Sequence, residues 1–126
     1  MSRVTGIGGI IIRANDPKKM CDWYKAHLGI DIQDWGGTAF RWIDDKGDPI
    51  HGTTAFSIGD GSNIEPSKSP FMVNYRVDDL HTLLSQLRLA KCHVLDNVEE
   101  SEFGKFGWVM DPEGNKIELW QPPEGQ

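Results

Sequence analysis

The chain has 126 residues and a net charge of −6, with 38% hydrophobic and 25% charged residues. This length and composition fit one compact domain with an ordinary hydrophobic core. The acidic balance, without a basic cluster, argues against a nucleic-acid-binding surface, and no apolar run approaches the roughly 18 residues that a membrane span needs. The N-terminus has no signal-peptide pattern, so we expect a cytoplasmic protein with no membrane partner, whose two cysteines are free thiols.

The first half of the chain predicts strand, helix and further strands. Residues 4–14 have the composition of a buried strand. Asp16 as N-cap and Pro17 at the first helical position predict a helix that ends at Gly29. Further strands are predicted to begin at Ile30, to cover residues 38–43 and to lie around residues 51–58, with turns between them.

Residues 59–70 predict a linker, because they contain three Ser, two Pro and two Gly and almost no apolar residues. The order of elements then restarts with a strand over residues 71–77. Asp78 and Asp79 predict the start of a helix with leucines at helical spacing. A short strand over 92–95, a charged loop over 97–105 and a hairpin around the turn at 111–115 complete the chain.

The two halves share a weak sequence repeat. Residues 13–16 and 76–79 both read R-x-x-D, at an offset of 63 residues, and each ends a strand and opens a helix. We therefore predict an internal duplication within a single domain over residues 1–126, with one module at about 4–58 and a second at about 71–121. The predicted fold class is α+β: two βαβββ modules that form a curved mixed sheet around a concave cleft, with the helices on the outer face.

Three segments carry a family resemblance: residues 12–17 with Trp23-Tyr24 and Leu28-Gly29, residues 75–80, and residues 111–115 followed by Ile117-Glu118-Leu119. With these segments the chain resembles the vicinal oxygen chelate superfamily. That superfamily includes glyoxalase I, extradiol dioxygenases, methylmalonyl-CoA epimerase, fosfomycin-modifying enzymes and bleomycin-type resistance proteins, so the shared fold does not select a function. The resemblance also implies a homodimer and a divalent metal ion in the cleft.

The resemblance implies that the metal ligands come from the first and last strands of each module. The first-strand positions fall at Gly9 and Met72, which cannot ligate such an ion through their side chains. The last-strand position of the second module is Glu118. Depending on the anchor chosen, its counterpart in the first module is Ala55, Thr53 or His51. We therefore expect an incomplete metal site and no cofactor. The alternative is a divalent metal ion whose ligand set is completed by His51 or by a residue of a partner chain.

Strand alternation predicts which side chains line the cleft. Gly9, Ile11 and Arg13 share the cleft face of the first strand, and Lys116, Glu118 and Trp120 share that of the last. Glu118 is the candidate catalytic residue, and the candidate ligand contacts are Ile11, His51, Met72, Asn74, Arg76, Trp108 and Trp120. The alternatives are an exposed Glu118, an Asn74 bonded to its sheet neighbours and an Arg76 paired with Asp78 or Asp79. Residues 99–107 are predicted to be a solvated connector or a mobile rim of the cleft.

Three functions remain in competition. The first is metal-free binding of a small organic molecule, in the manner of the bleomycin-type resistance proteins. The second is a metal-dependent, glyoxalase-like lyase or isomerase that uses Glu118 as a metal ligand or base. The third is an accessory module with a degenerate cleft.

Overall fold

The structure is a computed structural model that describes residues 2–126. Its elements, in chain order, are β1 (Val4–Arg13), α1 (Pro17–Leu28), β2 (Gly37–Ile43), β3 (Pro49–Gly59), β4 (Phe71–Val77), α2 (Leu80–Leu89), β5 (His93–Val94), β6 (Glu99–Ser101), β7 (Gly104–Met110) and β8 (Lys116–Gln121). Neither α1 nor α2 is long and apolar enough to cross a membrane, and residues 2–126 contain no other candidate helix.

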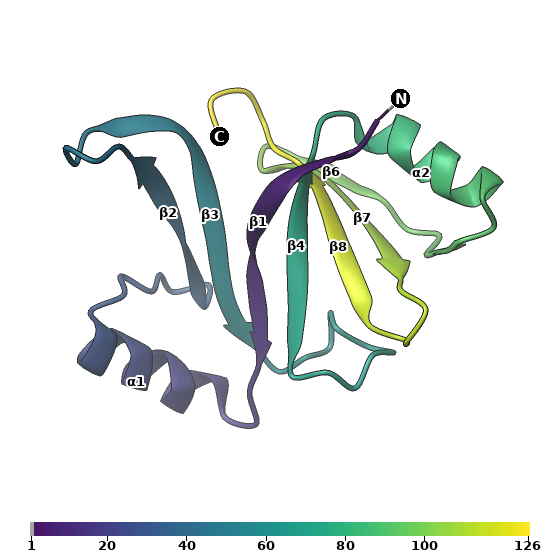
Figure 1. The fold of residues 1–126 in the computed structure, drawn as a ribbon. Helices are drawn as coiled ribbons and strands as arrows, with labels where there is room; N and C mark the ends of the chain where they lie inside the picture. The colour runs from purple at the N-terminus through teal and green to yellow at the C-terminus, as the bar shows by residue number, and fades with distance from the viewer. Residues whose placement is uncertain (1) are drawn as a thin grey trace.

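The strands form one open sheet in the order β2-β3-β1-β4-β8-β7-β5, with β6 added beside β7. The two halves of the chain meet edge to edge through the antiparallel pair β1–β4 (Figure 1). Within each half, the first and last strands are parallel neighbours, β1 with β3 and β4 with β8. The predicted α+β fold class with a curved mixed sheet is confirmed.

The predicted helix starts are also confirmed. The Asp16 side chain accepts a hydrogen bond from the Lys19 backbone N–H, and the Asp79 side chain accepts one from the Thr82 N–H. Gly29 ends α1 in the left-handed conformation that glycine adopts without steric cost.

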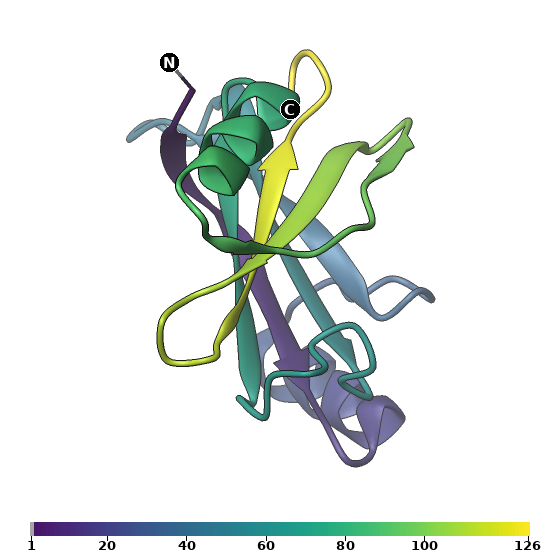
Figure 2. The same ribbon diagram turned by 90° about the vertical axis from the view of Figure 1, so that its right-hand side faces the viewer.

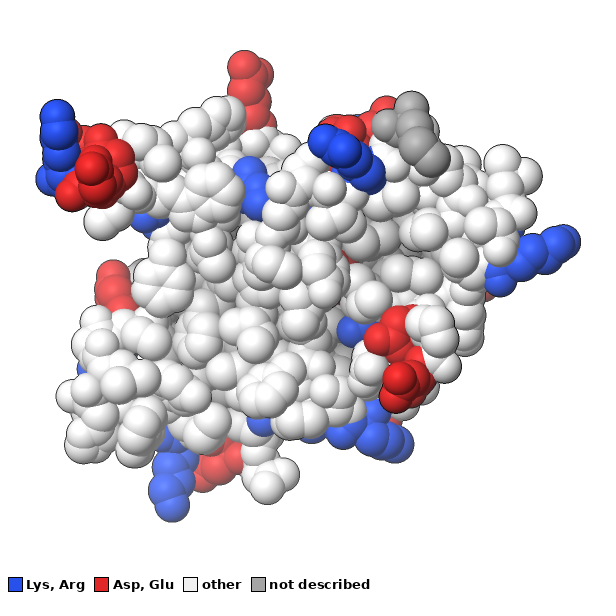
Figure 3. Space-filling model, in the orientation of Figure 1, with Lys and Arg blue, Asp and Glu red and all other residues white. Residues whose placement is uncertain are grey.

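Both helices pack on one face of the sheet. Under α2, the core consists of Val77, Leu80, Leu83, Leu84, Val109 and Leu119. Under α1, it consists of Ile12, Ala14, Ile32, Phe56 and Ile58. A third apolar cluster, Ile11, Ile64, Met72 and Trp108, lies on the opposite face, which we call the helix-free face. On the side of the molecule drawn in Figure 3, charged side chains lie mainly around the edge, and few cover β1 and β4.

Two predicted elements are wrong. No strand forms at Ile30, because Ile30 and Ile32 instead turn their side chains into the core beneath α1. The first half is therefore βαββ rather than βαβββ. Within the charged loop predicted over 97–105, residues Glu99–Ser101 form β6 and pair with the start of β7. In the resulting β6–β7 hairpin, β7 also pairs with β8 on its other side (Figure 2).

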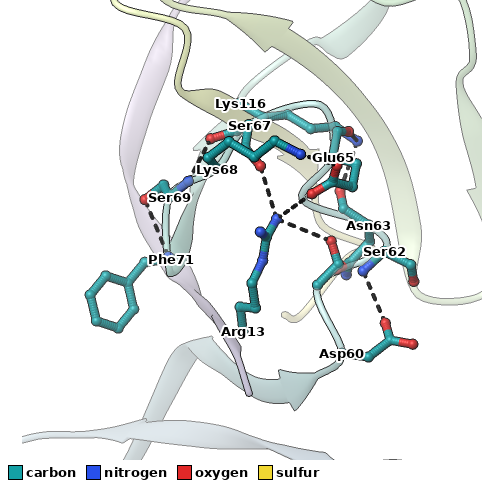
Figure 4. Close-up of polar contacts among 11 residues, drawn as sticks. Arg13, Asp60, Ser62, Asn63, Glu65, Ser67, Lys68, Ser69, Phe71 and Lys116 are labelled. Atoms are coloured by element: carbon teal, nitrogen blue, oxygen red, sulfur yellow. Dashed lines mark hydrogen bonds and ion pairs between the residues drawn. The ribbon is translucent and has the colours of Figure 1, made fainter. Parts of the chain in front are cut away.

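The predicted linker is an ordered covering of the helix-free face. Ile64 is fully buried there against the third apolar cluster. Arg13 donates hydrogen bonds to the Gly61 carbonyl, to Glu65 and to the Ser67 carbonyl (Figure 4). Lys116 donates to the carbonyls of Asn63 and Glu65. Residues 60–70, which we call the 60–70 segment, thus attach to both halves of the sheet.

Candidate functional site

Glu118 lies on β8 between two strands that supply its partners. In the sheet register it is opposite Asn74 on β4 and Trp108 on β7. The Asn74 amide donates to one carboxylate oxygen (Nδ2 to Oε1, 2.7 Å), and the Trp108 indole donates to the other (Nε1 to Oε2, 3.0 Å). Strand pairing thus brings the predicted residues Asn74, Trp108 and Glu118 together on the helix-free face.

The Glu118 carboxyl is only partly exposed, and this environment changes its acidity. Burial raises the pKa of Glu118 above its ordinary value, because the charged form is poorly solvated. The hydrogen bonds from Asn74 and Trp108 oppose that rise by stabilising the carboxylate. Burial prevails, so Glu118 holds its proton to a higher pH than an exposed glutamate does. The alternative of a solvated edge residue is wrong.

The next row of side chains across the sheet is aromatic and cationic. Trp120 on β8 lies opposite Arg76 on the neighbouring strand β4 and opposite Phe106 on the other neighbour, β7. The Phe106 and Trp120 rings stack with centroids 6.1 Å apart. The Arg76 guanidinium lies close to two indoles, 4.8 Å from the centre of the Trp42 ring and 5.3 Å from that of Trp120. This arrangement immobilises the Arg76 cation two residues along the strand from Asn74.

The predicted pairing of Arg76 with Asp78 or Asp79 is wrong. Asp78 instead accepts hydrogen bonds from the Ser2 hydroxyl and the Arg3 backbone N–H. Asp79 caps α2. Arg76 donates to the Thr53 carbonyl at 2.9 Å.

Two of the predicted ligand contacts lie in the apolar cluster of the helix-free face. Ile11 and Met72 are buried against Ile64 and Trp108. They pack in the same apolar cluster as Trp108, whose indole donates a hydrogen bond to Glu118. Contact of Ile11 or Met72 with a ligand remains a prediction.

The strand β1 has an irregularity between Ile7 and Gly9, which decides which of the two glycines approaches Asn74. A Cβ atom on Gly8 would lie 2.0 Å from Asn74 Oδ1, and one on Gly9 would lie 2.0 Å from the Ala55 carbonyl oxygen. Gly8, rather than Gly9, therefore faces the side chain of Asn74. The consecutive glycines are the sequence signal for such a bulge. The sequence analysis also missed the contact between Trp42 and Arg76, because no pattern of neighbouring residues indicates that these two side chains meet.

The residues present do not fit the divalent ion that the resemblance implies. Gly9 and Met72 offer no suitable donor, which leaves Glu118 as the ligating side chain that the second module supplies. His51 is exposed on β3, four residues before Ala55, which pairs with Gly9. That separation corresponds to about 13 Å along the strand. Among residues 2–126, no group of three or more His, Cys, Asp or Glu side chains is arranged to hold a metal ion.

Two hollows on the surface border α1 rather than Glu118. One has a volume of about 460 Å³ and is lined by residues that include Cys21, Ile32, Trp35 and Ile58. It lies beside the segment where the predicted strand at Ile30 does not form. The other has a volume of about 370 Å³ and lies between Arg13 and the side chains of Met20 and Trp23. Neither hollow is lined by Glu118 or by a candidate ligand contact, although Arg13, which was predicted to face the cleft, borders the second.

Solved structures share this fold at low sequence identity. A substituted form of Streptomyces coelicolor methylmalonyl-CoA epimerase, in complex with 2-nitronate-propionyl-CoA, has a TM-score of 0.69 at 14% identity, over 98% of this chain and 99% of that chain. Methylmalonyl-CoA epimerase from Mycobacterium tuberculosis has a TM-score of 0.60 at 18% identity, over 95% and 89% of the two chains. A glyoxalase/bleomycin resistance protein/dioxygenase superfamily member from Vibrio splendidus 12B01 has a TM-score of 0.61 at 14% identity, over 98% and 100%.

No curated protein sequence matches the chain. The family model described as Glyoxalase/Bleomycin resistance protein/Dioxygenase superfamily matches residues 6–119. This range runs from β1 to β8 and includes the hydrogen-bonded set of Asn74, Trp108 and Glu118. The chain therefore belongs to the glyoxalase/bleomycin resistance protein/dioxygenase superfamily.

Proposed function

We propose that the protein binds a small organic molecule on its helix-free face, with Glu118 at the centre of the contact surface and without a required metal ion. The observation that carries the proposal is the partly buried Glu118 carboxyl, fixed by Asn74 and Trp108 beside the Arg76 cation. A carboxylate oxygen can accept more than one hydrogen bond, so each Glu118 oxygen retains capacity for a ligand N–H or O–H. The surrounding indoles would supply apolar contact, as in most ligand sites.

Native mass spectrometry and metal analysis of protein purified without chelator test this proposal. We expect an organic molecule retained by the wild-type protein and lost from Glu118→Gln, because the amide cannot accept hydrogen bonds at both of its terminal atoms. Glu113→Gln is the matched control, since Glu113 is exposed in the turn before β8. Stoichiometric zinc, manganese, nickel or cobalt that disappears in Glu118→Gln would refute the metal-free form of the proposal.

A second candidate is a lyase or isomerase in which Glu118 removes a proton from the substrate. The raised pKa of Glu118 favours it, because a base works best when its pKa lies near the working pH. The solved epimerases suggest methylmalonyl-CoA as a probe. Incubation with this compound in deuterium oxide gives no deuterium incorporation under the first proposal. Incorporation that Glu118→Gln abolishes would favour the enzyme.

The accessory-module hypothesis predicts a different outcome for the same variant. In an inert face, Glu118→Gln would leave every ligand-induced thermal shift unchanged. The homodimer that the resemblance implies also remains a prediction, and light scattering on the purified protein tests it.

A further inference from the structure

The 60–70 segment covers the apolar cluster beside Glu118. Ile64 of this segment is fully buried in one cluster with Trp108, whose indole donates a hydrogen bond to Glu118. A small molecule needs a concave space against the groups that bind it. The two surface hollows described above both border α1, and neither is lined by Glu118. Access of a ligand to the Glu118 surface therefore depends on whether the 60–70 segment can move.

The backbone of the 60–70 segment is bonded to itself. The Ile64 N–H donates to the Gly61 carbonyl at 2.9 Å, and the Ser67 N–H donates to the Ile64 carbonyl at 3.0 Å. Among residues 2–126, no hydrogen bond between backbone groups joins residues 61–69 to a strand. The segment is thus a compact loop whose internal bonds survive when it moves as a unit.

The two ends of the segment lie side by side at the end of β1. The Ala14 N–H donates to the Gly59 carbonyl, and the N–H of the preceding residue, Arg13, donates to the Pro70 carbonyl, each at 2.8 Å. This is the narrow neck of an Ω-loop. The loop between these two points can swing outward without breaking a backbone bond of the sheet.

Three side chains hold the segment against the sheet. Ile64 is the only large apolar side chain within residues 60–70. Arg13 donates to the segment from β1 and Lys116 from β8, mostly to carbonyl groups (Figure 4). The exception is the Glu65 carboxylate, which accepts from Arg13 Nη2 at 2.9 Å and is about half exposed. So few fastenings are typical of a region with low local stability.

The surroundings of Ile64 indicate what could replace it. Without the Ile64 side chain, the space would be lined by Ile11, Met72 and Trp108, which are apolar. The nearby Glu118 carboxyl accepts hydrogen bonds from N–H or O–H groups. The matching ligand carries an apolar group of the size of the isoleucine side chain next to such a donor. Ile11 and Met72, which are buried here, would then contact the ligand as the sequence predicts.

We propose that the 60–70 segment is a gate over the Glu118 surface, closed by Ile64, and that the apolar group of the ligand takes the place of the Ile64 side chain when the gate opens. The inference rests on the proposed function, since it names the apolar part of the molecule that Glu118 binds. The closed gate competes with the ligand, so a change that loosens the gate should raise the apparent affinity.

Thiol labelling tests the motion of the gate. Ile64→Cys is made in the full chain together with Cys21→Ala and Cys92→Ser, which remove the two natural thiols. Leu84→Cys in the same background is the matched control, because Leu84 is buried in the core under α2. We expect iodoacetamide to modify the Ile64→Cys thiol at least about tenfold faster, at a rate that changes little in dilute urea. Equal rates with an equally steep dependence on urea would overturn the gate.

Titration with isoamyl alcohol, followed through the indole N–H resonance of Trp108, tests the ligand class. This alcohol has a branched apolar group and a hydroxyl donor, whereas ethanol, the control probe, lacks the branched group. Glu65→Ala should tighten binding of isoamyl alcohol about threefold, because it removes the ion pair with Arg13. Asp22→Ala is the matched control, since Asp22 forms an exposed ion pair of the same 2.9 Å length with Lys18 on α1. It should leave binding unchanged.

Each result bears on one proposal. Failure of isoamyl alcohol to bind the wild type and Glu65→Ala would overturn the ligand class, and so would equal binding of ethanol. Equal effects of Glu65→Ala and Asp22→Ala would overturn the competition between gate and ligand. If Glu65→Ala tightens binding while Glu118→Gln leaves it unchanged, the gate stands and the proposed role of Glu118 fails. If Glu118→Gln loses the copurified molecule while the Ile64→Cys thiol reacts only on global unfolding, the proposed function stands and the gate fails.

Discussion

Ile64→Ala tests whether the 60–70 segment is part of the folded core. The Ile64 side chain is fully buried against Ile11, Met72 and Trp108. The substitution removes three carbon atoms, and at about 0.8 kcal/mol for each buried CH₂ the lost transfer free energy is about 2.4 kcal/mol. The cavity left between β1, β4 and β7 adds to that cost, so we expect a loss of about 3–4 kcal/mol in the free energy of unfolding.

Urea unfolding at 25 °C measures this loss directly. For a chain of 126 residues, an unfolding entropy of about 2.1 cal/mol/K per residue converts it to a fall in Tm of roughly 11–15 °C. Ile50→Ala is the control, because Ile50 is 45% exposed on β3 and its truncation should cost less than about 0.5 kcal/mol. A loss below about 1 kcal/mol for Ile64→Ala would show that the segment opens at little cost and behaves as the linker that its composition predicts.

Three further predictions concern the site and the helix caps. Burial raises the folded-state pKa of Glu118 above its unfolded value near 4.5. The protonated carboxyl therefore stabilises the fold, relative to Glu118→Gln, by its full amount below pH 4.5. This stabilisation is lost as the pH rises through the folded-state pKa. Urea unfolding of both proteins from pH 4 to 8 should show that the free energy of unfolding of the wild type falls relative to that of Glu118→Gln as the pH rises. A difference in unfolding free energy that does not change with pH would contradict this prediction. Gly8→Ala should cost about 1–3 kcal/mol in unfolding free energy through its clash with Asn74, and an unchanged urea midpoint would contradict the bulge. Asp79→Ala should cost about 1 kcal/mol through loss of the α2 cap, and thermal unfolding that matches the wild type would exclude that role.

Features that depend on a few consecutive residues were predictable from the sequence. The turn at 111–115 is one, because the Asp111 side chain accepts hydrogen bonds from the backbone N–H groups of Glu113 and Asn115. The two helix caps follow from the same short-range chemistry. Strand alternation likewise placed Met72, Asn74 and Arg76 on one face, because β4 is regular over these residues.

Features that depend on contacts between distant segments were not predictable. One isoleucine in a polar stretch is a weak signal, and only the space between Met72 and Trp108 makes Ile64 a core residue. The extra residue at the β1 irregularity brings Gly8 against the Asn74 side chain, although Gly9 is the residue paired with Asn74 in the register. A pattern of period two cannot reveal such a shift.

The pairing of β4 with β8 sets how Glu118 lies relative to Arg76. Glu118 and Trp120 are two residues apart on β8, and Arg76 lies opposite Trp120. A rise of about 3.3 Å per strand residue therefore places the backbone of Glu118 and the backbone of Arg76 roughly 7 Å apart along the strand direction. The two groups do not form an ion pair with each other, since each is held by its own partners. A ligand with an N–H or O–H donor would satisfy Glu118, whereas a molecule without such a donor would leave the two carboxylate oxygens with their protein partners alone.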